Sequence, residues 1–264
     1  MDLQLTNKKA LVTGSTAGIG FAIASLLAQE GAVVVVNGRS QGRVEDAVRR
    51  IKTDNKDAQV TGLAADLGTR EGVNLLTTAL PALDILVNNL GVFEPKPFPD
   101  IPDEDWQRFF EVNVLSGVRL SRFYLPGMLQ RDWGRVVFIS SESGVNIPVE
   151  MIHYGVTKTA QIALARGLAE TTAGTNVTVN SVLPGPTRSE GVQQFVQDLA
   201  KHQDTDAATV EADFFRSARP SSLLKRFATP EEVAAMVVYV CSPRASATNG
   251  AALRVDGGVV RSIV

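Results

Sequence analysis

The chain has 264 residues, of which 44% are hydrophobic and 20% are charged, and it is long enough for one large globular α/β domain. The formal net charge of −2 provides no basic field for nucleic acid, and the single cysteine excludes an intramolecular disulfide, as in a reducing compartment. Strand-like sequence begins within about ten residues of the start, which leaves no room for a signal peptide, and no apolar run approaches the ~18 residues of a membrane span. We therefore expect a cytoplasmic protein with no nucleic-acid or membrane partner.

Strand and helix patterns alternate along the chain. Apolar runs rich in Val, Ile and Leu predict strands buried on both faces, as in a parallel sheet, at residues 9–13, 32–37, 59–64, 85–88, 135–140, 178–182 and 252–255. Helical patterns separate them at residues 19–29, 41–52, 70–79, 103–129, 153–171 and 230–240. This alternation predicts a single α/β domain over residues 1–264, with a Rossmann-like, doubly wound, mostly parallel seven-stranded sheet and helices on both faces.

One long segment, residues 185–227, interrupts the alternation without a strand pattern, and short helices are expected within it at residues 191–201 and 209–216. In an open α/β sheet, ligands bind beyond the carboxyl ends of the strands, and this segment leaves such an end. We therefore interpret it as a substrate lid. A surface excursion or an oligomer contact is the alternative.

A glycine-rich turn follows the first predicted strand and opens the first helix. Gly14 permits a tight turn, Gly18 lets the backbone approach a pyrophosphate, and Gly20 lets the helix pack closely on the strand. The N–H groups and the positive dipole end of the helix favour phosphate binding. The sequence therefore predicts a dinucleotide site, rather than a turn that binds nothing, at Gly14, Ser15, Thr16, Gly18, Ile19 and Gly20.

The end of the second predicted strand indicates which dinucleotide binds. An NAD enzyme of this architecture usually carries an acidic residue about 20 residues beyond the glycines, which binds the ribose 2′-hydroxyl. Gly38 stands at that place and is followed by Arg39 and Ser40. Loss of the carboxylate and gain of a guanidinium favour a 2′-phosphate, so we expect NADP, with NAD less favoured. The alternative is a surface arginine in a turn.

Tyr154 and Lys158 are one helical turn apart, so the phenol and the ammonium lie on the same helix face. A neighbouring cation favours the phenolate, and Lys158 is therefore expected to lower the pKa of Tyr154 and to make it a general acid or base near neutral pH. His153 points about 100° away on the helix, so a packing or pocket-wall role is expected for it. With only two histidines and one cysteine, far apart, no metal site is expected.

From residue 8 to residue 258 the chain resembles the short-chain dehydrogenase/reductase family. The resemblance rests on the order and spacing of Thr13 to Gly20, Asp66-Leu67, Asn88-Asn89-Leu90-Gly91, Asn113, Ser141, Tyr154-x-x-x-Lys158, Pro184-Gly185 and Val255-Asp256-Gly257-Gly258. Leu90 is a departure, because the family usually has alanine there. The resemblance implies an oxidoreductase that interconverts a carbonyl and a secondary alcohol, assembled as a homotetramer or homodimer through the long helices at residues 103–129 and 153–171.

The resemblance also implies roles for individual residues. Tyr154 exchanges a proton with the substrate oxygen, and Lys158 also binds the nicotinamide ribose. Ser141, selected over Ser140 by its offset of thirteen residues from Tyr154, hydrogen-bonds the substrate oxygen, and Asn113 holds a water that relays protons to Lys158. The other implied cofactor contacts are Asp66, Leu67, Asn88, Asn89, Gly91, Gly185, Thr187 and Ser189. Asp66 could instead cap a helix, and one of the two asparagines could only brace the backbone.

The substrate is less well indicated. Besides Ser141 and Tyr154, the expected pocket wall contains Glu142, Val145, Ile147, Met151 and lid residues such as Phe195. The nearest family branch, the 3-oxoacyl-carrier-protein reductases, presents basic residues where this chain has Asp132 and Thr175, which weakens that alternative. A small ketone, a sugar or another secondary alcohol remains open. A non-catalytic NADP-binding regulator is the alternative from another class, whereas an epimerase or dehydratase would need a longer C-terminal domain.

Overall fold

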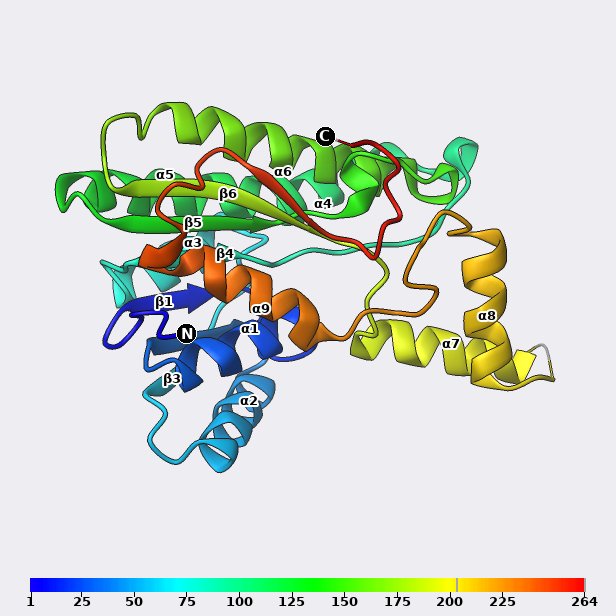
Figure 1. Cartoon of the computed structure of the whole chain (residues 1–264), viewed down its shortest axis with the longest axis horizontal. Coiled ribbons are helices and arrows are strands. Elements are labelled where there is room, and N and C mark those ends of the chain that lie inside the picture. Colours follow the sequence, from blue (N-terminus) through cyan, green and yellow to red (C-terminus); the bar gives the residue numbers. More distant parts are fainter. Residues whose placement is uncertain (203, 264) are drawn as a thin grey trace.

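A seven-stranded parallel sheet forms the centre of the molecule (Figure 1), with the strand order β3-β2-β1-β4-β5-β6-β7. The computed structural model describes residues 1–202 and 204–263, without the side chain of Phe195, so the expected place of that side chain in the pocket wall lies outside the described part. The strands are β1 Lys9–Val12, β2 Val33–Gly38, β3 Val60–Ala64, β4 Ile85–Asn88, β5 Gly134–Ile139, β6 Val177–Pro184 and β7 Ala252–Val255. The predicted doubly wound α/β fold is confirmed.

Helices cover both faces of the sheet. They are α1 Gly18–Gln29, α2 Gln41–Asp54, α3 Arg70–Ala79, α4 Asp103–Phe110, α5 Ser116–Gln130, α6 Ile152–Glu170, α7 Glu190–His202, α8 Ala207–Ser217 and α9 Pro230–Cys241. None of the helices in the described part of the chain is long and apolar enough to cross a membrane.

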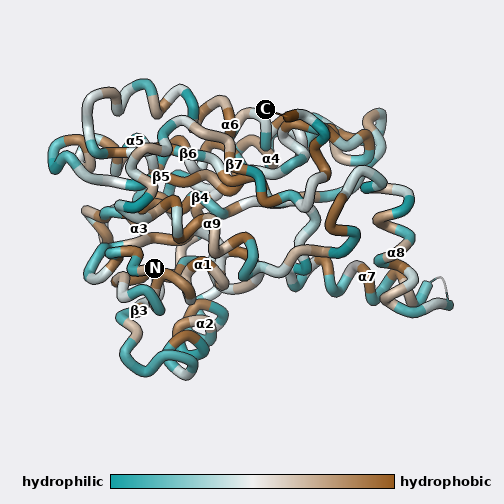
Figure 2. Tube along the Cα trace, in the orientation of Figure 1, coloured by the Kyte–Doolittle hydropathy of each residue, from teal (hydrophilic) through white to brown (hydrophobic). Residues whose placement is uncertain are grey.

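Alternating side chains of the strands build two separate hydrophobic cores. On β1, Ala10 and Val12 pack with residues of α1, α2 and α9, whereas Leu11 packs with residues of α3, α5 and α6. This alternation follows from the two-residue period of a strand, and it explains why β1 has apolar residues at consecutive positions. Figure 2 shows the hydrophobic colouring concentrated along the strands and the hydrophilic colouring on the outer helices.

The helix expected at residues 103–129 is interrupted by a π-helical turn, η2 (Glu111–Leu115), between α4 and α5. The N–H of Ser116, the residue after this turn, bonds to the carbonyl of Glu111, five residues earlier. Such a turn changes the hydrogen-bond ladder locally and is frequent at functional sites. Asn113, an expected catalytic residue, lies in this turn and is 1% exposed.

The segment at residues 185–227 forms a helical hairpin, α7 and α8, that projects beyond the carboxyl ends of the strands (Figure 1). It has a small hydrophobic cluster of its own, built around Val196, Val210, Phe215 and Phe227. The two short helices expected in this segment are therefore present, each longer than predicted by one or two residues at its ends.

Candidate active site

The glycine-rich turn after β1 is held against the end of β4. The Thr13 hydroxyl accepts from the backbone N–H groups of Asn89 and Leu90, at 2.9 Å each. The Asn89 side chain donates to the carbonyls of Thr13 and Gly14, at 2.9 and 3.0 Å. The sheet order reverses between β1 and β4, so this bracing fixes the turn at the crevice where doubly wound proteins bind ligands. Asn89 has the bracing role that was the alternative for one of the two asparagines.

The structure explains why two positions of the turn, Gly14 and Gly20, are occupied by glycine. Gly14 has a φ of 60°, a left-handed conformation that favours glycine. At Gly20, a Cβ atom would lie 2.4 Å from the Asn89 side-chain nitrogen and 2.6 Å from the Gly14 carbonyl oxygen. Helix α1 has no side-chain cap, which leaves its first N–H groups available to an anion.

A cavity of about 240 Å³ lies in front of the N-terminus of α1. It is lined by Ala17, Gly18, Ile19, Gly20, Asn89, Ser189, Glu190 and Gly191. The turn and the start of α7 thus face each other across the space where a pyrophosphate would sit. Of the residues expected to bind the phosphates, Gly18, Ile19 and Gly20 line this cavity, and Thr16 does not.

Ser15, expected to contact the cofactor, has no exposed surface. Its hydroxyl donates to the Val12 carbonyl at 2.7 Å and accepts from the Asn37 N–H at 3.0 Å. Its own N–H bonds to the Asn37 carbonyl at 2.8 Å. Both polar groups are occupied within the fold, so the expected cofactor contact of Ser15 is wrong, and the residue instead ties the turn to β2.

The expected 2′-phosphate site lies at the end of β2. A Cβ atom at Gly38 would lie 2.6 Å from Thr16 Cγ2, so an acidic residue would fit there only if Thr16 moved. Arg39 and Ser40 are exposed, and within the described residues Arg39 forms no ion pair. Its guanidinium is therefore free to meet a phosphate.

Asp66 and Leu67 follow β3. Asp66 is exposed and its Oδ1 accepts from the Gly68 N–H at 3.0 Å. Leu67 is 1% exposed, and its side chain packs in the core with α3, which leaves only its backbone for the adenine. Helix α3 is capped by Thr69, whose hydroxyl accepts from the Gly72 N–H, and not by Asp66.

The three expected chemical groups come together beyond β5. Tyr154 is half-buried on α6, and the Ser141 hydroxyl lies near enough to its phenol to lower the phenol pKa. The Lys158 Nζ lies 5.5 Å from the centre of the Tyr154 ring. Ser140 is not available to a substrate, because it is 3% exposed and its hydroxyl donates to the Lys158 carbonyl at 2.8 Å. The preference for Ser141 over Ser140 thus has a structural basis.

The pKa values of this pair differ from expectation. Burial raises the pKa of Tyr154 to about 12, and the nearby Ser141 hydroxyl only partly opposes this rise. Lys158 is 4% exposed, and burial lowers the pKa of its ammonium to about 7. The expected lowering of the Tyr154 pKa by Lys158 is therefore wrong in this structure, because burial of the phenol raises its pKa and Lys158 is not among the groups that oppose this rise. Lys158 donates to the Ile139 carbonyl and the Gln161 side chain, at 2.9 and 3.1 Å.

Asn113 is close to Lys158 but does not face it with its amide. Its Oδ1 accepts from the Val92 N–H at 2.7 Å, and its Nδ2 donates to the Val92 carbonyl and the Thr157 hydroxyl at 3.0 Å each. Its backbone carbonyl accepts from the Gln161 amide at 2.5 Å. The contact between Asn113 and Lys158 therefore runs through Gln161, a residue that the sequence analysis missed. Its place three residues after Lys158, on the stripe of Tyr154, was the available signal.

The remaining expected cofactor contacts surround this group. Gly91 lies beside Lys158, since a Cβ atom there would be 3.4 Å from Nζ. Asn88 is buried, its amide lies 3.4 Å from the Ser121 hydroxyl, and its Oδ1 has no partner. Gly185, Thr187 and Ser189 follow β6. The Thr187 hydroxyl donates to the Gly185 carbonyl at 2.9 Å. Ser189 lies beside the glycine-rich turn, since a Cβ atom at Gly18 would be 3.4 Å from the Ser189 Cβ.

Glu142, expected in the pocket wall, is 3% exposed and paired. Its Oε1 accepts from Arg219 Nε at 3.0 Å, and Arg219 also reaches Glu150 at 3.1 Å. Burial raises the pKa of Glu142, and the Arg219 charge opposes this rise. Glu142 directly follows Ser141, so its ion pair with Arg219 connects this part of the site to the end of the helical hairpin. Val145, by contrast, is 51% exposed and free to meet a ligand. Arg219 was missed because nothing in its local sequence indicates this partner.

Comparisons with known proteins show the family to which the chain belongs. A model of the family described as short chain dehydrogenase matches residues 8–200. The chain belongs to the short-chain dehydrogenase family. An uncharacterised oxidoreductase of Bacillus subtilis, YvaG, is 51% identical over 263 residues and covers 100% of both chains. A 3-oxoacyl-carrier-protein reductase of Aquifex aeolicus is 33% identical, covering 98% of this chain and 100% of its own.

Among solved structures, the L-sorbose reductase of Gluconobacter frateurii, complexed with NADPH and L-sorbose, superposes with a TM-score of 0.93. It is 33% identical, and the match covers 100% of both chains. The short-chain dehydrogenase described here thus shares its complete fold with a reductase, and it belongs to a family of oxidoreductases that act on small molecules.

Two features of this short-chain dehydrogenase lie outside the catalytic group. His153 is fully buried, with its ring 4.0 Å from that of Phe109 between centroids, in agreement with the packing role expected for it. Burial lowers the pKa of His153 and raises that of the Cys241 thiol to about 12. Within residues 1–202 and 204–263, no group of histidine, cysteine and acidic residues could hold a metal ion.

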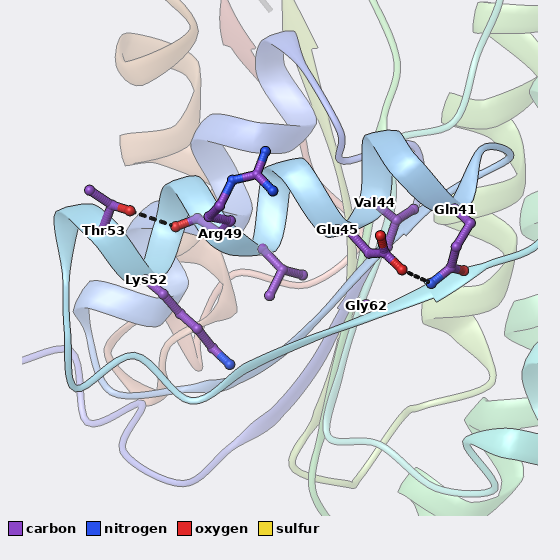
Figure 3. Close-up of a pocket in the computed structure, with 8 residues that line it drawn as sticks. Gln41, Val44, Glu45, Arg49, Lys52, Thr53 and Gly62 are labelled. Atoms are coloured by element: carbon purple, nitrogen blue, oxygen red, sulfur yellow. Dashed lines mark hydrogen bonds between the residues drawn. The ribbon is translucent and has the colours of Figure 1, made fainter.

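A larger cavity of about 410 Å³ lies between α2 and β3 at the edge of the sheet (Figure 3). Its lining is formed by Gln41, Val44, Glu45, Val48, Arg49, Lys52, Thr53 and Gly62, none of which belongs to the candidate site. The side chains of Gln41 and Glu45 bond to each other, and Thr53 bonds to the Arg49 carbonyl. These are contacts within one exposed helix face, as expected for a solvated surface.

Proposed function

We propose that this short-chain dehydrogenase is an NADP(H)-dependent oxidoreductase that interconverts a carbonyl and a secondary alcohol. The observation that carries the proposal is the group formed by the Ser141 hydroxyl, the Tyr154 phenol and the buried Lys158 ammonium. Nicotinamide supplies the hydride when it is bound. Tyr154 then holds the proton for the substrate oxygen, Ser141 donates a hydrogen bond to that oxygen, and Lys158 binds the nicotinamide ribose, as the family resemblance implies.

Burial supports this assignment for the direction of reduction. A Tyr154 pKa of about 12 keeps the phenol protonated at neutral pH, so a proton is present before the reaction begins. A Lys158 pKa of about 7 places the ammonium where small changes in its surroundings alter its charge. Both shifts are of the kind that active sites show.

NADP is proposed over NAD because Gly38 has no carboxylate and Arg39 is unpaired among the described residues. The similarity to a reductase solved with NADPH supports this choice. Asp66, on the same edge of the sheet, is exposed for the adenine.

For the substrate, the similarity to an L-sorbose reductase makes polyhydroxylated ketones the first class to test. The 3-oxoacyl-carrier-protein alternative is less well supported. Where a basic residue would meet an acidic carrier, Asp132 accepts from the Asn176 backbone and side chain, at 2.9 and 2.7 Å. An acid fixed at this position repels such a partner.

The test is an assay of ketoses, small ketones and 3-oxoacyl thioesters for loss of the reduced-nicotinamide absorbance, with NADPH and with NADH. Tyr154→Phe should lower kcat by about a hundredfold to ten-thousandfold, because it removes the proton donor. NADPH affinity and the melting temperature should change little, and Tyr239→Phe, at an exposed tyrosine of α9, is the matched control. NADPH binding without turnover of any carbonyl would favour the non-catalytic regulator, and full activity of Tyr154→Phe would refute the assigned chemistry.

A further inference from the structure

Gln161 connects Lys158 to the π-helical turn. It is 1% exposed and lies three residues after Lys158 on the same face of α6. Its Oε1 accepts from Lys158 Nζ at 3.1 Å, and its Nε2 donates to the Asn113 carbonyl at 2.5 Å. One buried amide therefore bonds to both an expected catalytic lysine and the backbone of an expected catalytic asparagine.

The orientation of this amide follows from its partners. An ammonium can only donate hydrogen bonds and a carbonyl can only accept them. The amide oxygen must therefore face Lys158, and the amide nitrogen must face Asn113. Together with the Ile139 carbonyl, 2.9 Å from Nζ, the Gln161 oxygen provides two fixed acceptors for the ammonium.

The π-helical turn explains why a carbonyl is available at this point. The shift of the ladder, with the Ser116 N–H bonded to Glu111, leaves neighbouring carbonyls without their usual partners. The Val112 carbonyl accepts from the Ser116 hydroxyl at 2.6 Å, and the Asn113 carbonyl accepts from Gln161. The Asn113 side chain is bonded to Val92 and Thr157 and does not reach Lys158.

We propose that Gln161 is a positioning residue for Lys158, and that its amide takes the place of the water which the family resemblance implied between Lys158 and Asn113. A water can accept and donate a proton at one atom, whereas an amide accepts at oxygen and donates at nitrogen. The connection through Gln161 therefore holds the ammonium and does not relay protons. The effect of Gln161 on turnover rests on the proposed function, whereas its effect on the titration of Lys158 does not.

Few other charges act on this ammonium. Tyr154 is on the same helix, and Glu142, on the short helix η3 (Glu142–Gly144), is paired with Arg219. In the π-helical turn, Glu111 is paired with Arg119. Within the described residues Lys158 has no ion pair, so a neutral acceptor such as Gln161 has a measurable influence on its titration.

The variant Gln161→Met keeps the length of the side chain and removes the amide. The Lys158 titration is followed by NMR on protein labelled at the lysine ε-carbon, with Lys158→Met to assign the signal. Loss of an acceptor disfavours the charged form, so the midpoint in Gln161→Met should fall by about one pH unit. Gln161→Glu keeps the acceptor and adds charge, so the midpoint should rise, and this variant also provides the test if the methionine variant does not fold.

Turnover gives the second readout. In Gln161→Met, kcat should fall by about tenfold to a hundredfold, and the alkaline limb of its pH profile should move to lower pH, because the ammonium is lost earlier. Gln29→Met, at an exposed position of α1, is the control. An unmoved Lys158 midpoint in both Gln161 variants, with or without a lower melting temperature, would overturn the proposal. Inactive wild type with a shifted Lys158 midpoint would instead refute the proposed function alone.

Discussion

Burial acts in opposite directions on the two ionisable groups of the candidate site. The phenol of Tyr154 is neutral when protonated, so burial favours the proton and raises its pKa to about 12. The ammonium of Lys158 is charged when protonated, so burial disfavours the proton and lowers its pKa to about 7. The same apolar surroundings therefore keep one proton in place and make the other easy to release.

The Lys158 pKa has a consequence for stability. Between pH 7 and the ordinary lysine value of 10.5, the unfolded chain binds the Lys158 proton more tightly than the folded chain does. The free energy of unfolding should therefore rise with pH in this window, by up to about 1.4 kcal/mol per pH unit relative to Lys158→Met, and this gain should be lost as the pH falls to 7. Urea unfolding at several pH values measures it, with Lys52→Met on the exposed face of α2 as the control. Parallel pH curves for wild type and Lys158→Met would contradict the lowered pKa.

The choice of cofactor depends on Arg39. Arg39→Ala should lower the ratio of kcat/KM for NADPH to that for NADH by about tenfold to a hundredfold, because a charge-assisted bond to the 2′-phosphate is lost. The efficiency with NADH should stay nearly constant. Arg49→Ala, on the same side of the molecule but paired with Asp46, is the control and should leave the ratio unchanged. An equal loss of kcat/KM with both cofactors would show that Arg39 does not bind the 2′-phosphate.

The elements of the fold were largely predictable from the sequence. Apart from the interrupted helix at residues 103–129, the ends of every expected strand and helix agree with the structure to within two residues. The π-helical turn could not be predicted, because it accompanies bonds from Asn113 to Val92 and Thr157, which are remote in the chain. Ser15 was misjudged for a similar reason, since its burial depends on Asn37 of the neighbouring strand. Short-range patterns indicate elements, whereas these contacts arise only once the elements have packed.

The helical hairpin of α7 and α8 is proposed as a lid on physical grounds. Ser189 at its start faces Gly18, Glu190 pairs with Arg43 of α2 at 2.9 Å, and Arg219 at its end binds Glu142. Its hydrophobic cluster is separate from the two main cores, so it can move without unpacking them.

NADPH bound beneath this lid should favour the closed state. A protease cuts between residues 185 and 227 only when the lid is open, and the open lid does not bind the cofactor. NADPH at 100 times its Kd should therefore slow this cleavage by about a hundredfold. The comparison is with 2′-phospho-ADP-ribose, also at 100 times its Kd, which keeps the 2′-phosphate but lacks the nicotinamide and should protect less. Cleavage of this segment at the same rate with and without NADPH would exclude the lid.

At the scale of the whole molecule, the homotetramer or homodimer remains a prediction, as does the cytoplasmic location. Phe123, on α5, is 47% exposed and lies on one of the helices to which the resemblance assigns subunit contacts, and Phe98, which precedes α4, is 58% exposed. Exposed aromatic side chains of this size favour burial against a partner. Light scattering at micromolar concentration should give four or two times the mass of the chain, and a monomer would refute the assembly.

The packing of α1 against α9 joins the two ends of the sequence. Ile23 and Leu27 of α1 share one core with Val233 and Val237 of α9. During translation, β1, α1 and β2 leave the ribosome early, but the helix that covers α1 is synthesised only near the end. The apolar face of α1 thus stays open to chaperones, or to other nascent chains, until residue 241 has emerged. The first βαβ unit can form beforehand, yet this half of the protein becomes stable only after α9 has packed against α1.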